Sequence, residues 1–148
     1  MTWRRARVST ALAWVLLSAA LGGCGTTVAS YRESASTAVQ TQLGGARTAE
    51  LAGRSWLDGN LPDTTATVVV GDADRTVGGA ESDFAAADPP AGAGGLRASV
   101  TQALGDTADA VAALRVAVDL GDRAAVLAAT RRLAATADQL EALGVRLR

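Results

Sequence analysis

Apolar residues recur every three or four positions in four stretches of the chain, which is the spacing of one face of an α-helix. The stretches cover about residues 30–57, 61–87, 96–118 and 122–148. Each is longer than a typical β-strand, and turn-forming residues separate them. The pattern therefore predicts four helices.

Residues at the expected helix ends support these boundaries. Ser30 and Glu33 have the spacing of a capping box, in which two side chains accept hydrogen bonds from free backbone amides. Pro62 lies near the start of the second stretch, where its missing amide hydrogen has no effect on the helix. Gly121 is suited to a left-handed helix end, and Asp122 to the N-cap of the last helix.

The second stretch also allows a different interpretation. Residues 64–70 are rich in β-branched threonine and valine, which favour a strand. The helical spacing nevertheless continues for more than twenty residues, so we expect a helix here.

Residues 88–95, with two prolines and three glycines, form the longest predicted link and divide the four helices into two pairs. Two pairs with short turns predict an all-α domain over residues 30–148, an antiparallel four-helix bundle built from two helical hairpins. Alanine fills many of the inward positions, and several glycines lie inside the expected helices. The core is therefore expected to be thin, with helices that approach closely.

The N-terminal residues have a different organisation. Residues 1–7 contain three arginines, and residues 8–21 are uncharged and apolar. Fourteen residues suit the core of a signal peptide better than a membrane-spanning helix, which needs about 20. An ordinary leader or an uncleaved anchor that contains a cysteine by chance is the alternative.

The apolar segment ends in Leu21, Gly22, Gly23 and Cys24. This sequence resembles the lipobox of bacterial lipoproteins. The resemblance implies that residues 1–23 are a signal peptide, that a signal peptidase cuts between Gly23 and Cys24, and that fatty acyl groups such as palmitate are attached to Cys24. Residues 24–29 would then be the lipidated N-terminus and a spacer.

Charge and residue types exclude several functions. Without the three leader arginines the chain carries 11 arginines and 15 carboxylates, a net charge of −4. A net charge of this sign gives no broad field that would attract nucleic acid or anionic lipid headgroups. The chain contains no histidine and one cysteine, so histidine-based catalysis, a disulfide within the chain and most transition-metal sites are ruled out. We therefore expect no catalytic residues, no metal and no cofactor.

Ordinary structural roles are available for the remaining polar and aromatic residues. The carboxylate pairs are expected to lie on solvated faces or at helix caps: Asp72 and Asp74, Asp106 and Asp109, Asp119 and Asp122. Glu50 and Arg54 have the spacing of a surface ion pair on one helix. Trp56, at a bundle end, either contacts a partner or membrane surface or closes the core.

These observations predict a lipoprotein anchored to the outer face of the cell membrane through Cys24. The layout also resembles small alanine-rich helical lipoproteins of unassigned function from high-GC bacteria. The expected role is that of a non-catalytic module that contacts other components of the cell envelope, including a protein partner. A carrier that holds a lipid or another apolar ligand within the bundle is the alternative.

Overall fold

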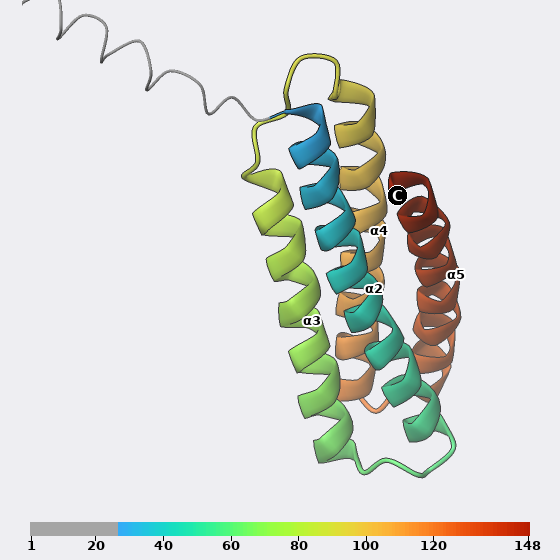
Figure 1. Cartoon of the computed structure of the whole chain (residues 1–148). Coiled ribbons are helices and arrows are strands. Elements are labelled where there is room, and N and C mark those ends of the chain that lie inside the picture. Colours follow the sequence, from blue (N-terminus) through green and yellow to red (C-terminus); the bar gives the residue numbers. More distant parts are fainter. Residues whose placement is uncertain (1–26) are drawn as a thin grey trace, which may run out of the picture.

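The computed structural model describes residues 27–148, which form four helices (Figure 1). The helices are α2 (Val28–Leu57), α3 (Asp63–Ala85), α4 (Gly94–Asp119) and α5 (Arg123–Leu147). The predicted all-helical class and helical bundle are confirmed for this part of the chain. The predicted signal peptide and Cys24 lie outside the described residues.

The stretch 64–70 belongs to α3, so it is helical and not a strand. Ala66, Val70, Ala73 and Val77 are buried at intervals of three and four residues, whereas Val68 is exposed. This burial pattern fits a helix. It does not fit a strand, because alternate residues of a strand share one face. Packing of the apolar stripe therefore outweighs the weak strand preference of the β-branched residues.

Helix α2 begins at Val28, two residues earlier than predicted, and the predicted Ser30–Glu33 capping box is wrong. The N-cap is Thr27, whose hydroxyl accepts a hydrogen bond from the Ser30 amide at 3.1 Å. The Ser30 hydroxyl accepts one from the Thr27 amide at 3.0 Å. A capping box one turn earlier adds further helical hydrogen bonds, so α2 extends into the predicted spacer 24–29.

The turn between α4 and α5 agrees with the sequence prediction. Gly121 has a φ of 65°, the left-handed conformation that glycine adopts without strain. The Asp122 carboxylate accepts hydrogen bonds from the amides of Ala124 and Ala125, each at 3.0 Å. Helix α4, by contrast, starts at Gly94, two residues before the predicted start, and has no side-chain cap.

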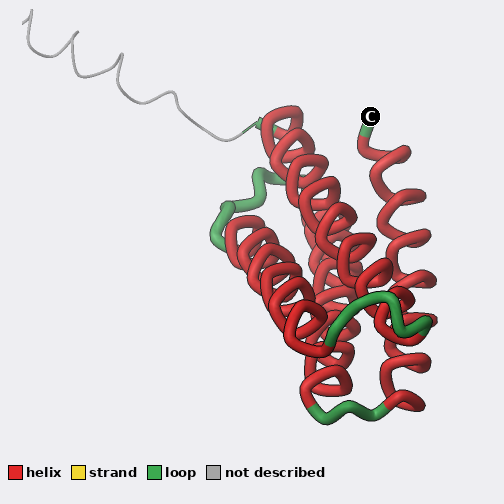
Figure 2. The backbone as a smooth tube through the Cα atoms, turned by 90° about the horizontal axis from the view of Figure 1, so that it is seen from below, coloured by secondary structure: helices red, strands yellow, loops and turns green. Residues whose placement is uncertain are grey.

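Successive helices run in alternating directions, and the segments between them lie at the ends of the bundle (Figures 1 and 2). Tyr31, near the start of α2, packs on Phe84, at the end of α3, with ring centroids 5.4 Å apart. The start of α2, residues 86–93 and the C-terminus lie at one end, which we call the upper end. The turns 58–62 and 120–122 lie at the other, the lower end.

Helices α2 and α4 approach each other across the middle of the bundle, in addition to packing on their neighbours. No comparable approach joins α3 and α5 within residues 27–148. Glycine makes the tight packing of α2 possible. A Cβ atom at Gly45 would lie 2.8 Å from the Val77 side chain, and one at Gly53 would lie 2.5 Å from the Thr130 hydroxyl.

The core consists of two apolar clusters, one in each half of the bundle. The upper cluster contains both Tyr31 and Phe84, and the lower cluster contains Trp56. Gln42 lies between them and is fully buried. Its amide nitrogen donates to the carbonyl oxygens of Leu104 at 3.0 Å and Val77 at 3.4 Å, while its Oε1 has no partner.

Candidate functional site

The predicted lipidation site lies immediately before the bundle. Cys24 and the cleavage site between Gly23 and Cys24 are outside the described residues, but Thr27 already caps α2. Three residue steps separate Cys24 from Thr27, and a fully extended chain covers about 11 Å over that length. Any group attached to Cys24 is therefore close to the upper end of the bundle.

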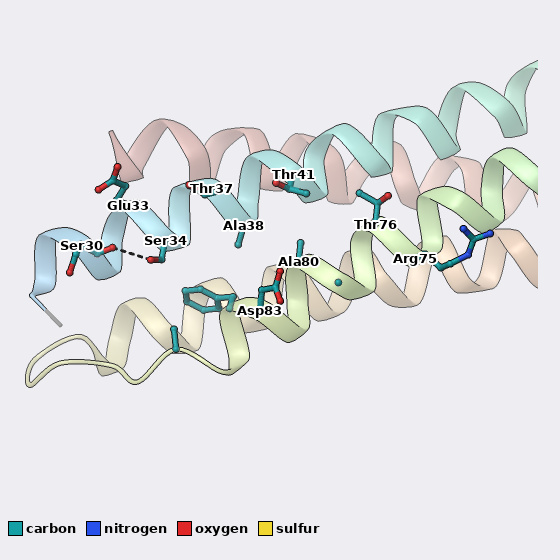
Figure 3. A pocket seen from close by; sticks show the side chains of 13 residues that line it. Ser30, Glu33, Ser34, Thr37, Ala38, Thr41, Arg75, Thr76, Ala80 and Asp83 are labelled. Carbon is teal, nitrogen blue, oxygen red and sulfur yellow. Dashed lines mark hydrogen bonds between the residues drawn. The ribbon is translucent and has the colours of Figure 1, made fainter. Parts of the chain in front are cut away.

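A groove between α2 and α3 in the upper half of the bundle has a volume of ≈ 670 Å³ (Figure 3). Hydroxyl side chains line it on both helices, and Glu33, Arg75 and Asp83 add charges. Ala38, Ala80 and Phe84 form its apolar part. The hydroxyl-bearing residues are Ser30, Ser34, Thr37, Thr41 and Thr76.

Two hydroxyl groups of this groove donate hydrogen bonds to the backbone of their own helices. Ser34 donates to the Ser30 carbonyl oxygen at 3.1 Å, and Thr76 donates to the Asp72 carbonyl oxygen at 3.0 Å. Bonds of this kind within a helix are ordinary for exposed serine and threonine. A nucleophilic hydroxyl needs an adjacent base, and no histidine exists in the chain to supply one. The groove can form hydrogen bonds with a polar partner through these hydroxyl and charged groups.

Glu50 is buried, with 4% of its surface exposed, so the predicted surface ion pair with Arg54 is wrong in its location. The pair itself is present. Glu50 also accepts a hydrogen bond from Arg47 at 3.0 Å. Two arginines therefore pair with one buried carboxylate. Burial of an unpaired charge would be strongly unfavourable.

Arg47 connects this buried carboxylate to α5. Its guanidinium donates to Asp138 at 2.7 Å and to Glu141 at 3.5 Å. Hydrogen bonds to Asp138 and then to Glu50 raise the pKa of Arg47. One arginine side chain thus contacts three carboxylates and joins α2 to α5.

Trp56 lies in the core, with 7% of its surface exposed. Its indole nitrogen donates to Asp63 at 2.7 Å, and the Arg123 guanidinium lies 5.5 Å from the ring centroid. These contacts join the end of α2 to the starts of α3 and α5. Trp56 therefore closes the lower end of the core, and a contact with a partner stays a prediction.

Four of the six carboxylates singled out from the sequence form ordinary structural contacts, while Asp106 and Asp109 lie half-buried and exposed within α4. Asp72 pairs with Arg75 at 2.7 Å, and Asp74 pairs with Arg115 at 3.3 Å. Asp119 accepts a hydrogen bond from Thr67 at 3.2 Å, and Asp122 caps α5.

Among residues 27–148, no three metal-binding side chains gather in one place. None of the helices in this part of the chain has the length and apolar character needed to cross a bilayer.

The chain matches no protein-family model, no curated protein and no solved structure.

Sequence reasoning missed the buried positions of Glu50 and Gln42. Both side chains are polar, and helical spacing alone placed Glu50 at the surface. A signal was nevertheless present, because Ala46, Ala49 and Gly53 are small and surround Glu50 on the helix. Small neighbours bring a second helix close enough to cover a longer side chain.

Proposed function

We propose that this protein is a lipoprotein anchored to the outer face of the cell membrane, with a non-catalytic helical bundle that contacts other envelope components. The observation that carries the proposal is the sequence Leu21-Gly22-Gly23-Cys24 at the end of a charged and then apolar N-terminal segment. A signal peptidase would cut before Cys24. The antiparallel bundle would follow as the mature domain.

Lipid attachment supplies the membrane affinity that the described helices do not provide by crossing the bilayer. A single fatty chain holds a protein only weakly, whereas two or three chains hold it firmly, because each buried methylene group contributes about 0.8 kcal/mol. Only Gly25 and Thr26 separate Cys24 from the helix cap at Thr27. The bundle would therefore remain next to the headgroups.

The role as a contact module is supported by the surface of the bundle. The groove between α2 and α3 presents hydroxyl and charged groups to solvent, which suits a polar partner. The carrier alternative would require an apolar ligand site, and the two apolar clusters are occupied by packed side chains.

Intact-mass spectrometry of the protein from membranes of a bacterial expression host tests the anchor. We expect loss of residues 1–23 and the added mass of a diacylglyceryl group, with or without an N-terminal acyl chain. Cys24→Ala should remain an unprocessed precursor. The neighbouring substitution Thr26→Ala is the matched control and should be processed like the wild type.

A bare Cys24 thiol, or Cys24→Ala cut and sorted like the wild type, would contradict the anchor. Crosslinking in the native envelope tests the contact module. We expect the anchored wild type to recover a defined protein that Cys24→Ala does not recover. Recovery of the same protein by both forms would show that partner binding does not depend on the lipid anchor. Recovery of stoichiometric lipid instead would favour the carrier.

A further inference from the structure

The fold separates the charges of the bundle onto two opposite sides. Helices α3 and α4 together contain three arginines and eight carboxylates, a net charge of −5. Helices α2 and α5 contain seven arginines and four carboxylates, a net charge of +3. The helices of each pair are neighbours in the bundle, so one side is acidic and the other basic.

Exposed apolar residues lie on both sides of the bundle, with Val68 on α3 and Val116 on α4 on the acidic side. On the basic side, Leu51 on α2 and both Leu127 and Val145 on α5 have exposed fractions of 67%, 41% and 58%. Leu127 lies with Arg54, Arg123 and Asp58 along a shallow hollow between the two helices. A surface that combines arginine with aliphatic side chains is typical of helices that lie in a membrane interface.

The arginines of this side differ in whether they form ion pairs with carboxylates of the bundle. Arg47 and Arg54 pair with carboxylates. Arg32 and Arg131 are exposed and form no ion pair with another residue of 27–148. Arg32 lies beside Arg148 at the upper end. Arg131 is one helical turn after Leu127 and shares its face.

We propose that the α2/α5 side of the bundle lies on a membrane surface that contains anionic phospholipids, with the acidic α3/α4 side facing away. This inference depends on the proposed anchor at Cys24. The anchor would hold the upper end within about 11 Å of the membrane, and the bundle would then rotate about this point. Lying on the α2/α5 side brings both the arginines and the exposed aliphatic side chains to the headgroups.

The net charge of the whole domain does not oppose this orientation. Two layers of packed helices are about 20 Å thick. Ionic strength near the physiological value screens charges beyond about 8 Å, so the lipid surface acts mainly on the near side of the bundle. One arginine close to an anionic surface increases binding roughly fivefold. Two unpaired arginines would therefore shift the balance between lying and upright orientations by about 25-fold.

Neutron reflectometry of the processed, lipidated protein on supported bilayers measures the orientation directly. A bundle that lies on its side gives a protein layer about 20 Å thick, whereas an upright one gives a layer of about 45 Å, the length of the 30-residue α2. We expect the thin layer on bilayers containing phosphatidylglycerol, and a thicker layer on pure phosphatidylcholine or at high salt.

The double substitution Arg32→Gln/Arg131→Gln should increase the layer thickness on the anionic bilayer. The matched control Arg75→Gln/Arg115→Gln removes the same charge from the acidic side and should leave the thin layer unchanged. Circular dichroism verifies that both variants keep their helical content. Intact mass measured beforehand reports on the anchor separately.

A lipidated protein that stands upright on the anionic bilayer overturns this orientation and leaves the anchor intact. Equal responses of the two double variants overturn it as well. A protein without acyl chains on Cys24 overturns the anchor, and the orientation with it.

Discussion

Gly44 and Gly45 are neighbours in α2 but lie in opposite environments, which allows the close approach of α2 and α3 to be measured. A Cβ atom at Gly44 would meet no other atom within 4 Å. A Cβ atom at Gly45 would lie 2.8 Å from Val77 Cγ2 and 3.6 Å from the Ala73 carbonyl oxygen. We expect alanine to stabilise the protein at the first position and not at the second.

The magnitudes follow from two terms. Replacing glycine by alanine inside a helix stabilises it by about 1 kcal/mol, and this term is the same at both positions. Overpacking of a filled core costs about 1–3 kcal/mol and applies only to Gly45→Ala. Gly44→Ala should therefore raise the free energy of unfolding by about 1 kcal/mol. Gly45→Ala should lower it by between zero and about 2 kcal/mol.

Equilibrium urea unfolding, followed by far-ultraviolet circular dichroism, measures both values. The difference between the two variants is the most reliable quantity, because the helix-propensity term cancels. Adding Val77→Ala removes the clashing methyl group, so Gly45→Ala should become less harmful in that background. Gly44→Ala should have the same effect with or without Val77→Ala. Equal stabilities of the two glycine variants would refute the close-packing explanation.

Five further substitutions test other contacts of the bundle. Trp56→Phe keeps an aromatic ring in place but removes the hydrogen bond to Asp63, so the free energy of unfolding should fall by about 1–2 kcal/mol in urea unfolding. Gln42→Leu removes a buried unpaired oxygen and leaves the helix carbonyls with their own hydrogen bonds, so it should stabilise by about 1 kcal/mol. Gln42→Ala leaves a cavity and should destabilise by about 2 kcal/mol, and the same sign for both variants would contradict this account. Arg47→Met removes one of two partners of a buried carboxylate and should cost about 1–3 kcal/mol, whereas Asp138→Asn at the exposed end of the network should cost below about 0.5 kcal/mol. Similar decreases in the free energy of unfolding for these two variants would show that the contact with buried Glu50 contributes no more than the contact with exposed Asp138.

Much of the fold could be predicted because local chemistry specifies it. The helical spacing of small and apolar residues extends through all four helices, and the buried stripe of α3 follows it from Ala66 to Phe84. Gly121 and Asp122 mark a turn by their own conformational preferences. The start of α2 was harder to predict, because Thr27 and Ser30 form a capping box as good as the expected one.

The buried polar residues could not be predicted, because their environment comes from distant parts of the sequence. Arg47 meets Asp138 from a position 91 residues away, and Gln42 reaches the Leu104 carbonyl across 62 residues. The burial of Glu50 depends on how closely α2 packs against its neighbours. Spacing within one helix identifies the face that is apolar, but it does not identify which helix covers the edge of that face.

The distribution of charge is the clearest example of a property that depends on how the helices pack and not on the sequence of any one helix. A net charge of −4 predicts no attraction to anionic lipid when it is spread evenly over a surface. The carboxylates of this chain, however, are concentrated in α3 and α4, and arginines predominate in α2 and α5. These helix pairs form opposite sides because α2 neighbours α5 and α3 neighbours α4, an arrangement that the order of the helices alone does not specify. Salt screens the charges on the far side of the bundle from the membrane. The charge of the near side therefore determines how the bundle interacts with the lipid surface. A short link from Cys24 to α2 would hold the bundle close to the membrane. The charge difference between its two sides would then favour the orientation in which the α2/α5 side faces the lipid.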